Sequence, residues 1–266
     1  MTAPDAVTRF TGFAGEYDAA RPRPPAAVVE VISQWCGVAD PDVVDLGAGT
    51  GLSSVIWAGH AGTLTAIEPS ADMRAVAGDR LAAAGGPAGW YTVADGTAED
   101  TGLPPGCADI VTASQAMHWF DADRALPEIA RLLRPGGVFA AYDCDWPPCI
   151  DWETDAAYLA ADLRIRELEA ARGLEPPRAP KTGHLARMRD SGLFRHTTEI
   201  AVHGLEQGDA ARLVALARSQ GGTMALLAAG ATEDELGLTV LREVAQRRLP
   251  QPRTWWWTYR IRLAVR

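Results

Sequence analysis

Three glycines stand within nine residues in the stretch VVDLGAGTG at positions 43–51. They are Gly47, Gly49 and Gly51. A glycine-rich turn between a strand and a helix lets a ligand approach the backbone without meeting a Cβ atom, close to a helix N-terminus. Dinucleotide sites need the spacing G-x-G-x-x-G, and Leu52 or Ser54 stands where the third glycine would be. The acid before the turn, Asp45, also suits a cationic neighbour better than a pyrophosphate.

A second acid ends the next apolar run, in TAIEPSADM. This acid, Glu68, could accept hydrogen bonds from both hydroxyls of a ribose. Sites for NAD and for S-adenosylmethionine share that feature, so Glu68 does not distinguish the two. The two motifs lie about one helix apart, and together they predict an adenosine across the carboxyl edge of a sheet.

Seven apolar runs predict the strands that must position these motifs. The first five alternate with helical stretches, which is typical of a parallel sheet wound with helices. Each of these five is rich in Val, Ile, Ala or Thr and stops at Gly, Pro or Asp. The expected strands cover residues 41–47, 63–69, 90–96, 108–115, 137–145, 195–204 and 254–265.

The rhythm changes after residue 150, where helical patterns cover 151–173 and 208–220. We therefore expect a core at 1–149 and a helical lid insertion at 150–194. Residues 195–266 return to the core sheet and carry a second helical lid segment at 205–250. The two helical segments would enclose a substrate.

Four motifs in order carry a family resemblance: VVDLGAGTG, IEPSADM, ADGTAEDTGLPPGCADIVTASQAMHWFD and LLRPGG. Together they resemble the class I S-adenosylmethionine-dependent methyltransferases, especially the small-molecule group similar to trans-aconitate methyltransferase. The resemblance covers roughly residues 10–146. It implies an α/β fold, a Rossmann-like seven-stranded sheet of order 3-2-1-4-5-7-6 with strand 7 antiparallel. It also implies S-adenosylmethionine (SAM) as cofactor and S-adenosylhomocysteine (SAH) as product.

The resemblance also implies roles for individual residues. The residues expected under the methionine part are Gly47, Ala48 and Gly49, with Asp45 near its amino group. Glu68 would hold the ribose. The residues expected around the adenine are Pro69, Met73, Thr97, Ala98 and Glu99. The wall near the methyl donor would be formed by Ser114 and Gln115.

The N-terminal stretch FAGEYDAARPRPP resembles a family element that folds over the cofactor. Tyr17 and Arg21 match that element, whereas Pro24 replaces a second tyrosine. Arg21 would pair with the cofactor carboxylate, a charge-assisted contact, or would be a surface charge. Tyr17 is a candidate for both cofactor binding and catalysis.

Methyl transfer from a sulfonium needs a general base only if the nucleophile must lose a proton. The candidates are His118, whose ordinary pKa near 6.5 suits a base, and Asp145, with Asp143 as a neighbour. Each has a structural alternative, a buried hydrogen-bonded histidine or a loop acid. The spacing of His118, Asp121 and Asp123 also permits metal ligation, but the two acids fit a helix cap better. We expect no metal.

Aromatic and polar side chains supply the candidates for acceptor binding. Besides His118 they are Trp119, Trp146, Lys181, Arg218 and Gln220. Aromatic residues near a cleft fit a planar or apolar substrate. Core packing of the tryptophans and solvated helix surface for the polar side chains remain the alternatives.

Composition narrows the function further. The formal net charge of -9 disfavours a nucleic-acid partner. No apolar run approaches the length of a membrane span, and the start lacks a signal segment, so we expect a cytoplasmic protein. Its monomeric or homodimeric state stays open.

We therefore predict an enzyme that methylates an O, N or C atom of a small molecule, in natural-product biosynthesis. The alternative is a SAM- or SAH-binding protein, or a cyclase, that uses the fold without methyl transfer. A nicotinamide-dependent oxidoreductase is disfavoured by the missing third glycine.

Overall fold

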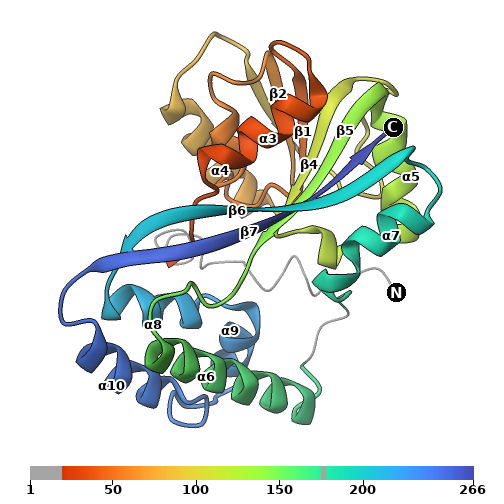
Figure 1. Ribbon diagram of the computed structural model, residues 1–266. Helices are drawn as coiled ribbons and strands as arrows, with labels where there is room; N and C mark the ends of the chain where they lie inside the picture. The colour runs from red at the N-terminus through yellow and green to blue at the C-terminus, as the bar shows by residue number, and fades with distance from the viewer. Residues whose placement is uncertain (1–19, 175–177) are drawn as a thin grey trace. The chain divides into compact units, whose positions relative to one another are not determined.

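The computed structural model describes residues 20–174 and 178–266 (Figure 1). These residues form two compact units, each described by itself below. The sheet unit comprises Arg23–Cys144, Arg178–His203 and Tyr259–Arg266. The helical unit comprises Gly204–Thr258 and the described parts of Met1–Pro22 and Asp145–Pro177.

One sheet of order β3-β2-β1-β4-β5-β7-β6 organises the strands. They are β1 (Asp42–Leu46), β2 (Thr63–Ile67), β3 (Tyr91–Ala94), β4 (Ala108–Ser114), β5 (Leu133–Cys144), β6 (His196–Gly208) and β7 (Arg253–Val265). The first five pair in parallel, and β7 runs antiparallel to β5. The strand order and the antiparallel β7 confirm the prediction. From β1 the chain adds strands toward one edge of the sheet, β2 and then β3, and from β4 it adds strands toward the other edge. A topological switch point therefore lies between β1 and β4.

Helices cover both faces of the sheet unit (Figure 1). On one face α5 (Ala122–Leu132) packs its Leu126 and Ile129 against Val111 and Phe139 of the sheet. The other helices of the sheet unit are α3 (Ala26–Cys36), α4 (Ala71–Ala84) and α7 (His184–Asp190), with the 3₁₀ turns η1 (Ser54–Trp57), η2 (Met117–Trp119) and η3 (Lys181–Gly183). Burial on both faces explains why the central strands read as continuous apolar runs.

The boundary between α5 and β5 differs from the sequence expectation. The sequence predicts a strand at 137–145, which begins at the last residue of the turn-like run Arg134-Pro135-Gly136-Gly137. Instead α5 ends at Leu132 and β5 begins at Leu133. A register shift between Ala108 and Ile110 on the neighbouring strand accommodates this early start. The turn-like residues 134–137 therefore mark an irregularity in the pairing of β5 with β4.

Residues 178–203 also group differently from the expected lid insertion at 150–194. They belong to the sheet unit, because Met188 of α7 and Phe194 enter the apolar core formed with α5. The helical unit contains α6 (Trp152–Ala171), α8 (Ala210–Arg218), α9 (Gly221–Ala228) and α10 (Leu238–Arg248). Its role as a lid stays a prediction. Among the described residues no helix is both long and apolar enough to cross a membrane.

Side chains of a strand alternate between its two faces, and the three consecutive tryptophans of β7 follow this rule. Trp255 and Trp257 are buried, whereas Trp256 is 52% exposed. Gly208 lies where any Cβ atom would run into the Trp255 ring, so only glycine leaves room for that indole.

The central strands should dominate the stability of the sheet unit. Ile110 on β4 is fully buried, so Ile110→Ala should lower the free energy of unfolding by about 2–5 kcal/mol. Ile200→Ala provides the matched control, because Ile200 is 40% exposed, and it should change stability by less than about 0.5 kcal/mol. Urea unfolding followed by circular dichroism measures both, and similar losses in the two variants would contradict this assignment of the core.

Candidate functional site

The three motif glycines all have positive φ angles, +65° for Gly47, +57° for Gly49 and +77° for Gly51. A Cβ atom on Gly47 would lie 2.8 Å from Cβ of Ala116, and one on Gly51 would lie 3.2 Å from Cα of Ala77. A Cβ atom on Gly49 would meet no atom of the described residues within 4 Å. Gly47 and Gly51 therefore let the turn pack closely on the protein, whereas Gly49 has open space beside it among the described residues.

The side chain of Asp45, at the end of β1, anchors the glycine turn through hydrogen bonds. Its carboxylate is fully buried and accepts hydrogen bonds from the hydroxyls of Ser53 at 2.9 Å, Ser54 at 2.6 Å and Thr112 at 2.8 Å. Burial raises the pKa of Asp45, and the three hydroxyls act in the opposite direction. In this structure the carboxylate holds β1, the residues after the turn and β4 together. Its contact with a cofactor amino group stays a prediction.

Glu68 lies directly beside the open part of the turn. One carboxylate oxygen accepts the N–H of Gly49 and the other accepts the N–H of Ser70, both at 2.9 Å. Burial raises the pKa of Glu68, against the effect of these two donors. Each carboxylate oxygen keeps a second lone pair, so Glu68 retains the capacity to accept ribose hydroxyls.

The residues predicted around the adenine follow β2 and β3. Met73 and Ala98 are buried, Pro69 and Glu99 are half-buried, and Thr97 is exposed. Their contacts with a cofactor stay predictions, and Tyr17 lies outside the described residues.

The predicted wall near the methyl donor carries an unusual backbone angle. Gln115 has a φ of +52°, although it is not glycine. Its side-chain amide donates to Sγ of Cys144 at 2.9 Å, and its carbonyl accepts a hydrogen bond from the Lys181 ammonium. Lys181, predicted only as an acceptor-binding candidate, thus reaches the wall formed by Ser114 and Gln115. A side chain from a distant part of the sequence completes this edge.

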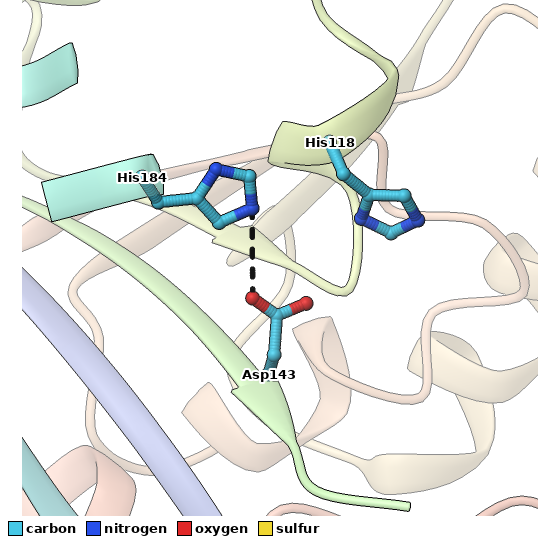
Figure 2. Close-up of side chains that lie close together, drawn as sticks. All are labelled: His118, Asp143 and His184. Atoms are coloured by element: carbon cyan, nitrogen blue, oxygen red, sulfur yellow. Dashed lines mark ion pairs between the residues drawn. The ribbon is translucent and has the colours of Figure 1, made fainter. Parts of the chain in front are cut away.

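A buried polar cluster adjoins Lys181. Figure 2 shows His118 from η2, Asp143 from β5 and His184 from α7 turned toward one another. Asp143 pairs with the Lys181 ammonium at 3.0 Å and with the Arg262 guanidinium at 2.8 Å, and Nε2 of His184 lies 3.7 Å from it. The sequence placed His118 and Asp143 near the site edge but gave no sign of Arg262, whose partner is 119 residues away.

Burial changes the ionisation of this cluster. It lowers the pKa of His118 to about 3, with Lys181 acting in the same direction, and it lowers the pKa of His184 to about 4. For Asp143 burial favours the neutral acid, but the Lys181 ammonium favours the carboxylate, and the pKa is lowered. Both histidines are therefore neutral at pH 7. The ordinary pKa that made His118 a candidate base does not hold in the folded protein.

By residue type, the three clustered side chains could also hold a metal ion, since their ligand atoms lie within 4.8 Å of one another. Two contacts disfavour that use. Asp143 is already shared by two cationic side chains. The Arg187 guanidinium lies 2.6 Å from Nδ1 of His184, and because a guanidinium only donates, it leaves the ring proton on Nε2, toward Asp143. The contacts fit a hydrogen-bonded ion-pair cluster better than a metal centre.

The other acids near His118 have structural places. Asp121 caps α5 and accepts the N–H of Asp123 at 3.2 Å, which confirms the predicted helix cap. Asp145 belongs to the helical unit, unlike Asp143 and His118. Trp119 is half-buried, with its ring 4.9 Å from that of His118.

Three predicted residues come together within the helical unit. The Arg21 guanidinium lies 4.9 Å from the centre of the Trp146 ring and donates to the Ser219 carbonyl at 2.8 Å. Gln220 accepts from Arg21 at 3.4 Å and donates to the Tyr158 hydroxyl at 3.3 Å. Arg218 lies apart from this group and pairs with Glu233. Arg21 thus stacks on Trp146 within the helical unit, whereas the sequence predicted it as a cofactor residue.

Gly47 and Gly49 give a matched test of the turn geometry. Alanine at either position should cost about 1–2 kcal/mol of stability, because a left-handed backbone disfavours a Cβ atom. Gly47→Ala should cost about 1–3 kcal/mol more than Gly49→Ala, because its Cβ would overlap Ala116. Urea unfolding of the ligand-free variants measures the difference, and equal losses would refute the close packing at Gly47.

The part of the chain that contains the site is similar to known methyltransferases. A family profile described as a methyltransferase domain matches residues 44–141, which include the turn, Glu68 and the wall at Gln115. An uncharacterized methyltransferase of Mycobacterium tuberculosis (strain ATCC 25618 / H37Rv) is 37% identical over 134 residues, 50% of this chain and 51% of that protein. The chain thus matches about half the length of this curated relative.

Solved structures extend the likeness to the fold. A putative type II methyltransferase from Anaeromyxobacter dehalogenans superposes with a TM-score of 0.67 at 26% identity, covering 92% of this chain and 97% of that one. A geranyl diphosphate methyltransferase in complex with SAM has a TM-score of 0.53 at 16% identity, with 96% and 91% covered, and shows the fold alone. Residues 44–141 therefore form a methyltransferase domain of the class I S-adenosylmethionine-dependent type.

Proposed function

We propose that the chain transfers the methyl group of SAM to an O, N or C atom of a small-molecule acceptor and releases SAH. The observation that carries the proposal is the open backbone at Gly49 beside the carboxylate of Glu68. A ligand can approach the turn there without meeting a side chain of residues 20–174 or 178–266, and Glu68 has lone pairs left for ribose hydroxyls. Both features suit an adenosine, and the buried acid before the turn, Asp45, suits the cationic sulfonium of SAM better than a pyrophosphate.

The site supports catalysis by positioning rather than by strong bases. Methyl transfer from a sulfonium is an in-line displacement with a good leaving group, and alignment of the reacting atoms can supply about 7–11 kcal/mol in favourable intramolecular cases. His118 and His184 are both weak bases in the folded protein. We therefore assign His118 to acceptor binding and orientation in this proposal, with Trp119 beside it.

The acceptor class rests on charge and composition. A formal net charge of -9 argues against a nucleic-acid substrate. The polar cluster beside Gln115 offers a few fixed hydrogen-bonding groups, as small-molecule sites do. A cytoplasmic role in natural-product biosynthesis belongs to this proposal on composition alone.

Calorimetric titration with SAM and SAH tests the cofactor site. Both ligands should bind, and Glu68→Ala should weaken binding by about 1–3 kcal/mol, because hydrogen bonds from the ribose to a carboxylate are lost. Glu30→Ala is the matched control, since Glu30 is an exposed carboxylate on α3, and it should leave both affinities unchanged.

The outcomes distinguish methyl transfer, cofactor binding without methyl transfer, and the absence of cofactor binding. If neither ligand binds to the folded protein, the methyltransferase proposal fails. If SAM binds but no added small molecule ever yields SAH, the chain is a binding protein or a cyclase that keeps the cofactor intact. SAH formed only when an acceptor is present supports methyl transfer.

A further inference from the structure

We propose that Lys181 holds the reacting oxygen of the acceptor, which is a carboxylate or another acidic oxygen rather than an amine or a carbon. This inference rests on the proposed function and narrows its acceptor class. It assigns to one side chain the task of placing an oxygen lone pair beside the methyl-donor wall.

The composition of the chain singles out this residue. Lys181 is the only lysine among the 25 lysine and arginine residues in the sequence. Arginine serves every other place where the chain carries a permanent cationic side chain. An ammonium differs from a guanidinium in being compact, with three donors that radiate from one atom. The one lysine therefore stands where a small cation with freely directed donors is useful.

The contacts of the ammonium leave room for a ligand. Nζ of Lys181 donates to the Gln115 carbonyl and pairs with the Asp143 carboxylate at 3.0 Å. An ammonium has three N–H donors, so these two contacts leave one for an incoming oxygen. The side chain is 32% exposed, whereas that of Asp143 is only 6% exposed. Lys181 is thus anchored on its buried side and accessible on the other.

Asp143 holds the ammonium in place, and other groups hold Asp143. The Arg262 guanidinium donates to Asp143 at 2.8 Å and to Glu199 at 2.7 Å. These contacts connect β5, β6 and β7, so the carboxylate has a fixed position in the sheet. We regard Asp143 as a positioning residue, because it acts on the acceptor only through Lys181.

The surrounding charge favours an anion. Arg178 and Lys181 act electrostatically on His118, and Arg187 and Arg262 act on His184. Among the described residues, the carboxylates in contact with Lys181 and Arg262 are Asp143 and Glu199. With Arg187 also beside His184, the described cations of this cluster outnumber its described carboxylates, in a chain whose net charge is -9. A protonated amine would be repelled here, whereas an oxyanion would be attracted.

The proton balance points the same way. The neutral histidines beside Lys181 are weak proton acceptors, so an acceptor that arrives ionised has an advantage. In the reaction a lone pair of the oxyanion forms the O–CH₃ bond while the S–CH₃ bond breaks. The bonding pair of electrons stays on sulfur and gives neutral SAH. No proton moves in this step, so the site needs no general base.

A single lysine makes a direct test possible. Biosynthetic labelling with ¹³Cε,¹⁵Nζ-lysine gives one side-chain NMR signal, from Lys181. The labelled protein is saturated with SAH and titrated with formate, an oxyanion small enough for any acceptor pocket. We expect the Lys181 signal to shift saturably with formate and to stay unchanged with methylammonium, the cationic probe of similar size.

Variants make the test specific. Lys181→Met should weaken formate binding, followed by calorimetry, by about tenfold or more, as expected for the loss of a charge-assisted hydrogen bond. Asp143→Asn should move the Lys181 signal in the absence of formate and weaken formate binding, because the ammonium loses its anchor. Arg166→Met is the matched control, since Arg166 is an exposed cation of the helical unit paired with Asp162, and it should leave formate binding unchanged.

Failure of this inference is distinguishable from failure of the proposed function. If SAH binds and formate leaves the Lys181 signal unchanged, or methylammonium shifts it more than formate, the assignment of Lys181 is overturned and methyl transfer still stands. If SAH itself does not bind, the proposed function fails first. Should Asp143→Asn not fold, the formate and methylammonium titrations of the unmodified chain still decide the question.

Discussion

The hydrogen bond between Asp45 of β1 and Thr112 of β4 lies at the point on which the site depends. These two strands are neighbours in the centre of the sheet, and the strand order runs outward from them in both directions. Loops that leave their carboxyl ends must diverge, and the divergence opens a crevice for a ligand. A buried carboxylate shared by three hydroxyls fixes both strand ends and the residues that follow the glycine turn. Ligand binding can therefore use a backbone that is already in place.

A second buried carboxylate, Asp143, organises the neighbouring edge. Burying a charge is costly unless it is paired and hydrogen-bonded. Lys181 and Arg262 provide that compensation, and Glu199 in turn compensates Arg262. The antiparallel β7 matters here, because its pairing places Arg262 opposite Ala141, two residues before Asp143 on β5. The antiparallel β7 thus provides one of the two cations that compensate the buried charge of Asp143.

The two carboxylates divide the site by chemistry. Around Asp45 and Glu68 the groups are backbone amides, hydroxyls and acids, which suit a ribose and a cationic sulfonium. Around Asp143 the groups are cations and neutral imidazoles, which suit an electron-rich acceptor. Gln115 joins the two regions, since it follows β4 directly and accepts a hydrogen bond from Lys181. Groups of opposite charge preference thus meet at Gln115.

The sequence by itself determined the strands, the glycine turn and the acids that follow β1 and β2. These features are local: alternation, turn residues and glycine spacing act over a few neighbouring residues, so they are legible without a fold. The strand order came from the resemblance of four motifs to a known family, and the structure confirmed it. The start of β5 was predicted wrongly, because strand pairing overrode the turn signal of Pro135 and Gly136.

Only the tertiary structure decided which polar side chains meet. Asp143 and Arg262 are separated by 119 positions, and Lys181 and Gln115 by 66. Strand register and the path of residues 178–203 bring them together, and neither can be read from local patterns. The ionisation of His118 likewise follows from its burial beside Lys181, which no residue near it in the sequence reveals. Local chemistry therefore predicted the glycine turn, whereas long-range packing made the polar cluster around Asp143.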